Sequence, residues 1–354
     1  FEDVVVTLDT NDISTSQGDY ALSSNTITIE AGETEGTASL TATDDGIYEG
    51  DEEVEVAITD VSGGSASIGT PQAVTITISE DQQSPEVTIE ASPSSIGEGN
   101  TSTITATLTN ETFEDVVVTL DTNDISTSQG DYALSSNTIT IAAGETEGTA
   151  SLTATDDGIY EGDEDVEVTI TNVAGGSASY VVPETVTITI QEGLDQPEVS
   201  LSASPLNIEE DETTTLTATL SSATYEDVVV SLDTNNISTS PDDFNLTSYT
   251  ITIEAGNLSG STSLVGVADD TYEGNEMTEI SISSVSGGSA RLTDSQQLTI
   301  VLIEDDLPPT VTLSASPGSI PEDGSSTITA TLSNPTYENV LIVIETSNNT
   351  TSDE

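Results

Sequence analysis

Carboxylate side chains are the main chemically active groups of this chain, and they gather in short loops. Between residues 85 and 196, Glu98 precedes an apolar segment, Asp131 stands in a Gly-Asp-Tyr step, and Glu192 follows the last apolar segment. Residues 156–164 read Asp-Asp-Gly-Ile-Tyr-Glu-Gly-Asp-Glu. Hard divalent cations take oxygen ligands, and calcium tolerates the irregular geometry of loops better than magnesium, which requires a regular octahedron. The pattern therefore predicts calcium sites.

Composition excludes most other chemistry. The 354 residues include 65 Asp or Glu but only one Lys or Arg, which gives a formal net charge of −64. His and Cys are absent, so imidazole bases, thiolates, Cys/His zinc sites, haem ligation and disulfides are excluded. Nucleic acid and anionic membrane surfaces are excluded as direct partners, because binding to their phosphates depends on Lys and Arg. A carboxylate-based glycosidase is disfavoured by the absence of Trp, and we expect no enzyme.

The elements that position these loops are predicted to be β-strands. Segments such as 74–78 and 104–108 alternate apolar with hydroxylated residues, which is typical of strands buried on one face. We predict seven strands in residues 85–196, namely 86–90, 102–109, 115–121, 137–141, 148–154, 165–172 and 185–191. Two antiparallel sheets packed face to face bury their apolar sides. The Gly pairs at 63–64, 175–176 and 287–288 are expected in turns that need positive φ.

An internal repeat of 112 residues organises the chain. Phe-Glu-Asp-Val-Val-Val at residues 1–6 recurs at 113–118, with related sequences at 225–230 and 337–342. Proline recurs at the same step, at Pro85, Pro197 and Pro309. This period is the length of one β-sandwich domain. We therefore predict all-β, tandem immunoglobulin-like antiparallel β-sandwiches in an extended string, divided into a partial domain without its opening strands (1–84), two whole domains (85–196 and 197–308) and a partial domain of opening strands only (309–354).

Two explanations fit the broken domains at the two ends. The chain is either a window of a longer array, or its last segment supplies opening strands to the first domain of another chain. The two partial domains together duplicate 18 positions of the repeat, which strand donation does not need, and this favours the window.

The ordered motifs resemble the Calx-β domain family over essentially the whole chain. The resemblance rests on an Asp-Tyr or Asp-Phe step after a Ser/Thr-rich loop, on the acidic loops at 44–52 and 156–164, on the Gly-Gly turn, and on a last strand that runs into acidic residues. An early Glu precedes the second strand at Glu98, Glu210 and Glu322. The resemblance implies an immunoglobulin-like sandwich that binds Ca²⁺ at one end, beside the junction with its neighbour.

The resemblance also implies the calcium ligands of each copy. They are Asp19, Asp44, Asp45, Glu49, Glu80 and Asp81 in the first, Glu98, Asp131, Asp156, Asp157, Glu161 and Glu192 in the second, Glu210, Asp243, Asp269, Glu273, Glu304, Asp305 and Asp306 in the third, and Glu322 in the fourth. The third copy departs at Ala268, where the second has Asp156, and at Asn275, where the second has Asp163. The second copy ends Glu192-Gly193-Leu194, where the family tends toward three acidic residues. Fewer calcium ions or weaker binding are expected at that junction.

We therefore expect a non-enzymatic, extracellular or cell-surface protein: a fibre or adhesin stalk whose calcium ions stiffen the junctions between domains. Its expected partners are calcium ions and either neighbouring repeats or identical chains in a head-to-tail filament, with no direct membrane insertion. The alternative is a calcium-sensing regulatory domain of a larger protein, in which binding changes an interdomain angle. A sensor predicts a change of shape over a narrow calcium range, and a stalk predicts rigidity at ambient calcium.

Overall fold

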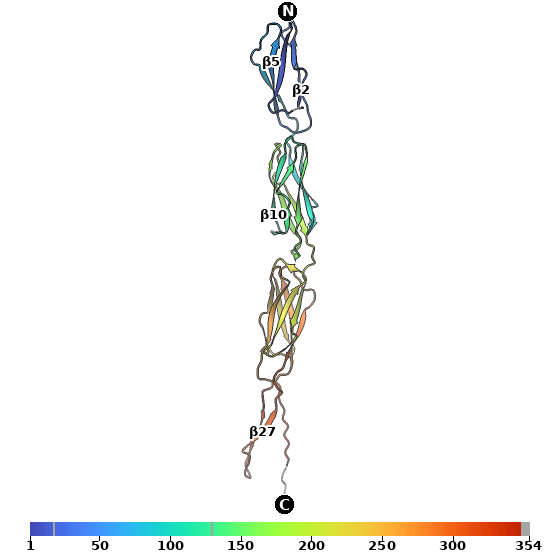
Figure 1. Ribbon diagram of the computed structural model, residues 1–354. Coiled ribbons are helices and arrows are strands. Elements are labelled where there is room, and N and C mark those ends of the chain that lie inside the picture. The colour runs from blue at the N-terminus through green and yellow to red at the C-terminus, as the bar shows by residue number, and fades with distance from the viewer. Residues whose placement is uncertain (17, 129, 348–354) are drawn as a thin grey trace. The chain divides into compact units, whose positions relative to one another are not determined.

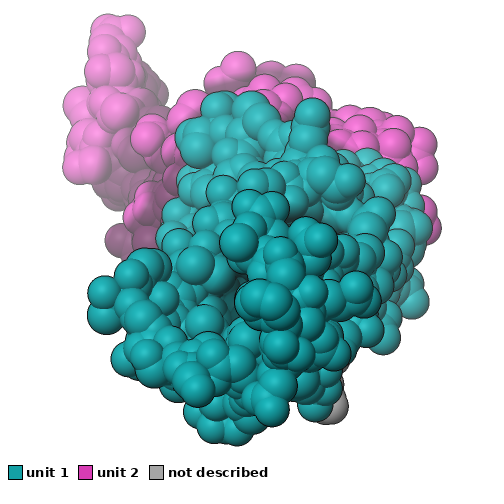
Figure 2. Space-filling view, turned by 90° about the horizontal axis from the view of Figure 1, so that it is seen from above, with its two compact units in different colours: residues 1–157, 163–193 teal, residues 158–162, 194–354 magenta. Residues whose placement is uncertain are grey.

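The chain is built of strands, as the sequence predicts. The computed structural model describes all residues except 17, 129 and 348–354, and the described residues form 28 strands and no helix (Figure 1). None of them therefore forms a helix able to cross a membrane. The chain separates into two compact units, residues 1–157 with 163–193 and residues 158–162 with 194–354 (Figure 2). The domain limits placed at residues 84, 196 and 308 remain predictions, and the four copies of the repeat are called the first to fourth repeats below.

The second repeat contains two sheets, ordered β12-β10-β15-β16-β8 and β11-β13-β9-β7. Neighbouring strands are antiparallel, except that β8 runs parallel to β16. The strands are β7 (Val87–Ser92), β8 (Ser95–Gly97), β9 (Thr101–Leu108), β10 (Val116–Asp124), β11 (Tyr132–Leu134), β12 (Thr138–Ile141), β13 (Glu147–Ala154), β14 (Ile159–Tyr160), β15 (Glu164–Ala174) and β16 (Thr185–Gln191). All seven predicted strands are present. The additional β8, β11 and β14 have only two or three residues each, too few for an alternating pattern to reveal.

The core of the second repeat lies between these two sheets. Both sheets contribute to one cluster of buried apolar side chains, including Val87 and Ile104 from one sheet and Val116 and Val168 from the other. The apolar residues that occupy every second position of the seven predicted strands are buried, except Val186, which is partly buried against the cluster. Period-two alternation therefore identified the core correctly.

The third repeat has the same topology, with sheets ordered β18-β26-β25-β21-β23 and β17-β19-β24-β22 around a second core cluster. Its strands are β17 (Val199–Ser204), β18 (Asn207–Glu209), β19 (Thr213–Leu220), β20 (Ala223–Thr224), β21 (Val228–Asn236), β22 (Phe244–Leu246), β23 (Thr250–Ile253), β24 (Ser259–Gly266), β25 (Glu276–Ser286) and β26 (Gln297–Ile303). The same register in both repeats places equivalent loops at equivalent positions.

The first repeat and the last segment are incomplete sandwiches. The first has a four-stranded sheet ordered β3-β1-β5-β6 and the two-stranded sheet β2-β4, and the last segment is the hairpin β27–β28. Their strands are β1 (Val4–Asp12), β2 (Tyr20–Leu22), β3 (Thr26–Ile29), β4 (Leu40–Ala42), β5 (Glu52–Ser62), β6 (Ala73–Ile78), β27 (Val311–Ser316) and β28 (Thr327–Leu332). Counterparts of β7 and β9 are absent from the described residues of the first repeat and present in the hairpin.

The Gly-Gly pairs adopt the predicted positive φ. Gly175 has φ +99°, and a Cβ atom there would lie 2.1 Å from the backbone oxygen of Asp115. Because both the backbone conformation and the contact exclude a side chain, Gly175→Ala is expected to lower the free energy of unfolding by about 2–4 kcal/mol. Gly144→Ala, at φ +77° but in open space, should cost only about 1–2 kcal/mol. Urea unfolding of the two variants measures the difference, and equal losses would contradict a role for the close contact.

Candidate metal centre

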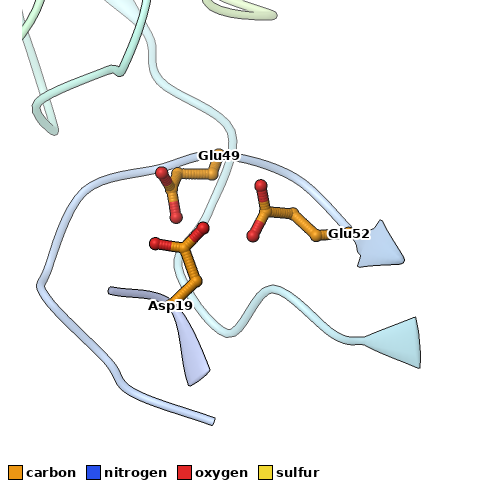
Figure 3. Close-up of side chains that lie close together, drawn as sticks. All are labelled: Asp19, Glu49 and Glu52. Carbon is orange, nitrogen blue, oxygen red and sulfur yellow. The ribbon is translucent and has the colours of Figure 1, made fainter. Parts of the chain in front are cut away.

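The first repeat brings three carboxylates together where β2 and β5 meet their preceding loops. Asp19 directly precedes β2, Glu49 lies in the loop before β5, and Glu52 opens β5. One carboxylate oxygen from each lies within 4.8 Å of the others, and Figure 3 shows the three carboxylates turned toward a common point. The Glu52 side chain is 7% exposed. Burial, followed by the charges of Glu49 and Asp19, raises the pKa of Glu52 to about 7.

A pocket of about 190 Å³ contains this cluster. Its lining includes all six carboxylates that the sequence predicts for the first repeat, together with Glu52. The other predicted residues, Asp44, Asp45, Glu80 and Asp81, therefore face the same hollow as Asp19 and Glu49. Their role as ligands stays a prediction.

Glu80 fastens the loop that carries Glu49. One of its carboxylate oxygens accepts hydrogen bonds from the backbone N–H groups of Glu49 and Gly50 at 2.7 and 3.0 Å. The other accepts from Asp81 and Gln82 at 2.9 and 3.0 Å. Burial acts to raise the pKa of Glu80, but these four hydrogen bonds outweigh it and hold the pKa below its usual range. These hydrogen bonds favour the ionised form of Glu80, which ties the segment after β6 to the loop that carries Glu49.

The second repeat gathers carboxylates around Glu98. Burial raises the pKa of Glu98 to about 7, and the charges of Glu192, Asp156, Asp157 and Asp131 raise it further in that order. All five are residues predicted from the sequence.

Glu161 and Glu164 are further carboxylates of the second repeat, in the acidic loop 156–164. Asp131 and Glu164, the first residue of β15, have carboxylate oxygens within 4.8 Å of one another. The remaining predicted residue, Glu161, is half-buried in segment 158–162, which belongs to the other compact unit.

The third repeat contains two carboxylate clusters. One comprises Glu210, Glu304 and Asp305, and the other comprises Asp243, Glu273 and Glu276. Within the second, burial and then a hydrogen bond to Asp243 raise the pKa of Glu276 to about 8. Burial, followed by the charges of Glu304 and Asp305, raises the pKa of Glu210 to about 7.

Two buried carboxylate oxygens in the third repeat have no hydrogen-bond partner, which indicates whether a metal ion would fit there. Glu210 Oε2 and Asp306 Oδ2 are inaccessible to solvent and accept no hydrogen bond. Unpaired buried carboxylate oxygens are costly, and the surrounding groups are carboxylates rather than cations. The one ion pair of the described residues, Arg291 with Glu198 at 2.9 Å, involves neither of them. An all-oxygen, all-anionic donor set of this kind fits calcium.

Sequence reasoning missed Glu52, Glu164 and Glu276, which join clusters in the three repeats. Each lies three residues after a predicted ligand, and each opens a long strand. The available signal was their recurrence at the 112-residue step at the very start of a strand. Glu322 is the opposite case, because it is exposed and belongs to none of the clusters found among the described residues.

Asn275 does not remove a member of these clusters. Its side-chain oxygen accepts the backbone N–H of Glu304 at 3.1 Å, as Asp163 accepts that of Glu192 and Asp51 that of Glu80, both at 3.0 Å. An amide oxygen accepts this bond as well as a carboxylate does. The position is therefore structural in all three repeats, and it gives no reason to expect weaker binding in the third.

The loops that carry Glu49 and Glu273 also pair with the repeat that follows each of them. Tyr48 forms a parallel bridge with Thr112, and its backbone N–H donates to the Glu111 carbonyl at 3.0 Å. Tyr272 pairs in the same way with Thr336. Each of these tyrosines directly precedes a cluster glutamate, Glu49 or Glu273. The position of the carboxylate cluster is thereby coupled to the junction between repeats.

The raised pKa values predict that the metal-free chain becomes less stable as pH rises. The glutamates with a folded-state pKa near 7 or 8 are Glu52, Glu98, Glu210 and Glu276. Because they hold protons that the unfolded chain has released above pH 4.5, their stabilising effect is complete below that pH and is lost as pH rises to about 8. Urea unfolding without metal should show a loss on the order of 1 kcal/mol per glutamate from pH 5 to 8. A gain over that interval would contradict the burial of these groups.

Comparisons with known proteins match two family models to different parts of the chain. A model of the LapA domain matches residues 83–193 and 195–306, and a model of the Calx-beta domain matches residues 2–82. No curated protein sequence matches the chain.

Solved structures give low similarity scores. The structure titled CBD12 from CALX1.2 is 17% identical, covers 57% of this chain and 81% of its own, and has a TM-score of 0.28. The Yersinia pseudotuberculosis adhesin InvE is 14% identical, covers 66% and 70%, and has a TM-score of 0.31.

Proposed function

Because the chain belongs to the LapA domain family and places carboxylate clusters beside the junctions of its repeats, we propose that it is a calcium-binding structural segment of a surface adhesin. The Calx-beta match of the first repeat supports the choice of metal. We place this segment outside the cell, where calcium is millimolar and fills even weak sites. No step of this proposal requires catalysis.

The observation that supports the proposal most strongly is that one loop contributes both to a carboxylate cluster and to the junction with the next repeat. Glu49 lies in the Asp19–Glu49–Glu52 cluster, and its neighbour Tyr48 pairs with Thr112 of the next repeat. The linker is held from both sides, because Gln82 Nε2 donates to Asp44 at 3.0 Å and Asn110 Nδ2 donates to the Gln83 carbonyl at 2.6 Å. Fixing the carboxylates therefore fixes the loop and the linker together.

Repulsion between the clustered carboxylates explains why a bound cation would stiffen the junction. Without a cation, the carboxylates of each cluster repel one another and favour loop conformations that separate them. A bound calcium ion would supply the positive charge that this chain otherwise lacks. The clustered residues Asp19, Glu49 and Glu52 would then hold one loop conformation, and the bridge at Tyr48 would transmit it to the next repeat. We expect a flexible junction to become a stiff one.

Small-angle scattering with calcium and then with excess chelator tests this function. A stalk predicts a larger maximum dimension and lower flexibility in calcium, retained throughout the millimolar range. Identical profiles in calcium and chelator would contradict stiffening. A change of shape confined to a narrow, lower calcium range would favour the alternative of calcium-sensing domains in a larger protein.

Magnesium is the control for the scattering experiment. At equal concentration it supplies the same charge but requires octahedral coordination at shorter distances. We expect it to stiffen the junctions less than calcium. Equal effects of the two ions would indicate general screening of the net charge of −64 rather than binding at the clusters.

A further inference from the structure

One pocket of the third repeat has a lining without any carboxylate, in a chain that contains 65 Asp or Glu residues. Its volume is about 410 Å³. It lies where the end of β21 meets β22 and the loops on either side of β22, and its lining residues are Thr234, Asn235, Asn236, Pro241, Phe244 and Tyr249. Small-molecule sites in proteins usually measure about 300–1,000 Å³ and combine aromatic side chains with a few polar groups. This pocket has both properties.

Two exchanges between the second and third repeats open this pocket. In the second repeat, the hydroxyl of Tyr132 donates a hydrogen bond to the carboxylate of Asp124. The third repeat has Phe244 and Asn236 at these two positions of the 112-residue step. A phenyl ring has no hydroxyl with which to reach the amide, and both residues line the pocket. The space that a hydroxyl and its partner occupy in the second repeat is therefore accessible in the third.

The same exchange removes a second hydrogen bond from the fold. In the second repeat, Thr127 donates to Asp124 at 3.2 Å. Its counterpart Thr239 is 8% exposed, and the Thr239 hydroxyl has no partner among the described residues. A buried hydroxyl without a partner lowers stability. Departures from a locally favourable arrangement are typical of positions that serve a ligand, and this favours a functional explanation of the exchange.

Tyr249 presents an aromatic ring from a well-anchored turn. It is 55% exposed, and the second repeat has Asn137 at this position. The Tyr249 carbonyl accepts the backbone N–H of Leu232 at 2.8 Å. In the same turn, the Ser248 hydroxyl accepts the backbone N–H of Thr250 at 3.1 Å. Because the backbone is already fixed, a ligand that packs against the ring has little more than the side-chain rotations of Tyr249 to restrict.

The chemistry of the lining fits a sugar. A pyranose ring has an apolar face of C–H bonds and a rim of hydroxyls that both donate and accept hydrogen bonds. Tyr249 offers an aromatic surface to the apolar face. The amides of Asn235 and Asn236 offer donors and acceptors to neighbouring hydroxyls, and Asn235 is oriented by a hydrogen bond from its Nδ2 to Glu279 at 3.2 Å.

We propose that this pocket of the third repeat is a binding site for a neutral saccharide. The net charge of −64 opposes the approach of anionic sugars, and the lining offers them no cation. The lining includes no member of the carboxylate clusters, so the inference does not rest on the proposed calcium function.

Saturation-transfer difference NMR on the whole chain in calcium tests the proposal with glucose, galactose, mannose and N-acetylglucosamine. At least one of these neutral sugars is expected to bind, with a dissociation constant on the order of 1 mM, because a monosaccharide offers few contacts. Glucuronate and galacturonate supply the same rings with a carboxylate and are expected to show no transfer. The absence of transfer to all four neutral sugars, or equal transfer to the uronates, would overturn the proposal.

Substitutions assign the binding to the pocket. Tyr249→Ala removes the exposed ring and should weaken binding at least about tenfold. Tyr337→Ala is the matched control, because Tyr337 is 66% exposed and does not line the pocket. We expect it to leave the affinity unchanged. An unchanged affinity in Tyr249→Ala would overturn the proposal.

The double variant Asn236→Asp with Phe244→Tyr restores the pair that the second repeat contains. It should refill the pocket and give the Thr239 hydroxyl an acceptor, as Asp124 does for Thr127. We expect binding to weaken more than about tenfold while the midpoint of urea unfolding does not fall. Full affinity in this variant would overturn the proposal. Sugar binding without calcium stiffening would contradict only the stalk function, and calcium stiffening without sugar binding only the saccharide site.

Discussion

Calcium at a hundred times its dissociation constant is expected to raise the melting temperature of the chain by roughly 10–20 °C above that in excess chelator. A ligand at that concentration that binds only the folded state contributes about 2.7 kcal/mol for each site. In a domain of this size, each kcal/mol shifts the melting temperature by about 4–8 °C. The clusters add a further reason, because the carboxylates that repel one another in the metal-free fold would then have a counterion.

Differential scanning calorimetry measures this effect directly. The control uses sodium chloride at an ionic strength equal to that of the calcium solution, which screens the net charge without entering the clusters. If the sodium control reproduces the whole shift, the stabilisation comes from screening and site binding is contradicted. Melting temperatures that are equal in calcium and chelator would also contradict it.

Glu210→Gln is expected to change stability in opposite directions with and without calcium. Glu210 has a buried oxygen without a partner, and burial together with Glu304 and Asp305 raises its pKa to about 7. In chelator at pH 8, the amide removes a charge that the fold holds unfavourably and should stabilise the chain by about 1 kcal/mol. In calcium, the loss of a charged oxygen should weaken binding in the third repeat at least about tenfold.

Glu209→Gln is the matched control. The residue is adjacent in sequence and exposed, and it belongs to none of the clusters found in the described part of the chain. Chemical unfolding in chelator and in calcium should give values within about 0.5 kcal/mol of the parent. If Glu210→Gln destabilises the metal-free chain, Glu210 is held by favourable contacts, and the interpretation of its environment is wrong.

Much of the fold follows from local sequence pattern. The alternation of apolar and hydroxylated residues in segments such as 104–108 reports directly which side faces the core, because side chains alternate along a strand. It cannot report β8, β11 or β14, whose two or three residues are held by partners distant in sequence. Tyr160 in β14, for example, pairs with Thr224 of the next repeat, a contact that no local pattern encodes.

The candidate site was predictable in its location but not in its full membership. The loop motifs predicted Asp19 and Glu49 as ligands, and their carboxylates lie in one cluster, but Glu52, the last residue of the same acidic loop motif, was not among the predicted ligands. Whether the first residue of a strand faces a neighbouring loop depends on the packing of that loop. The role of Asn275 likewise depends on a backbone N–H that comes from Glu304, 29 residues later.

Isothermal titration calorimetry with calcium tests most directly whether these clusters bind calcium. We predict saturable binding of at least one ion in each of the first three repeats, with affinity that increases from pH 6 to pH 8 as the raised-pKa glutamates release protons. Glu210→Gln should remove or weaken one class of sites and Glu209→Gln none. Heats that never saturate, or that are the same for both variants at every pH, would contradict calcium binding by these clusters.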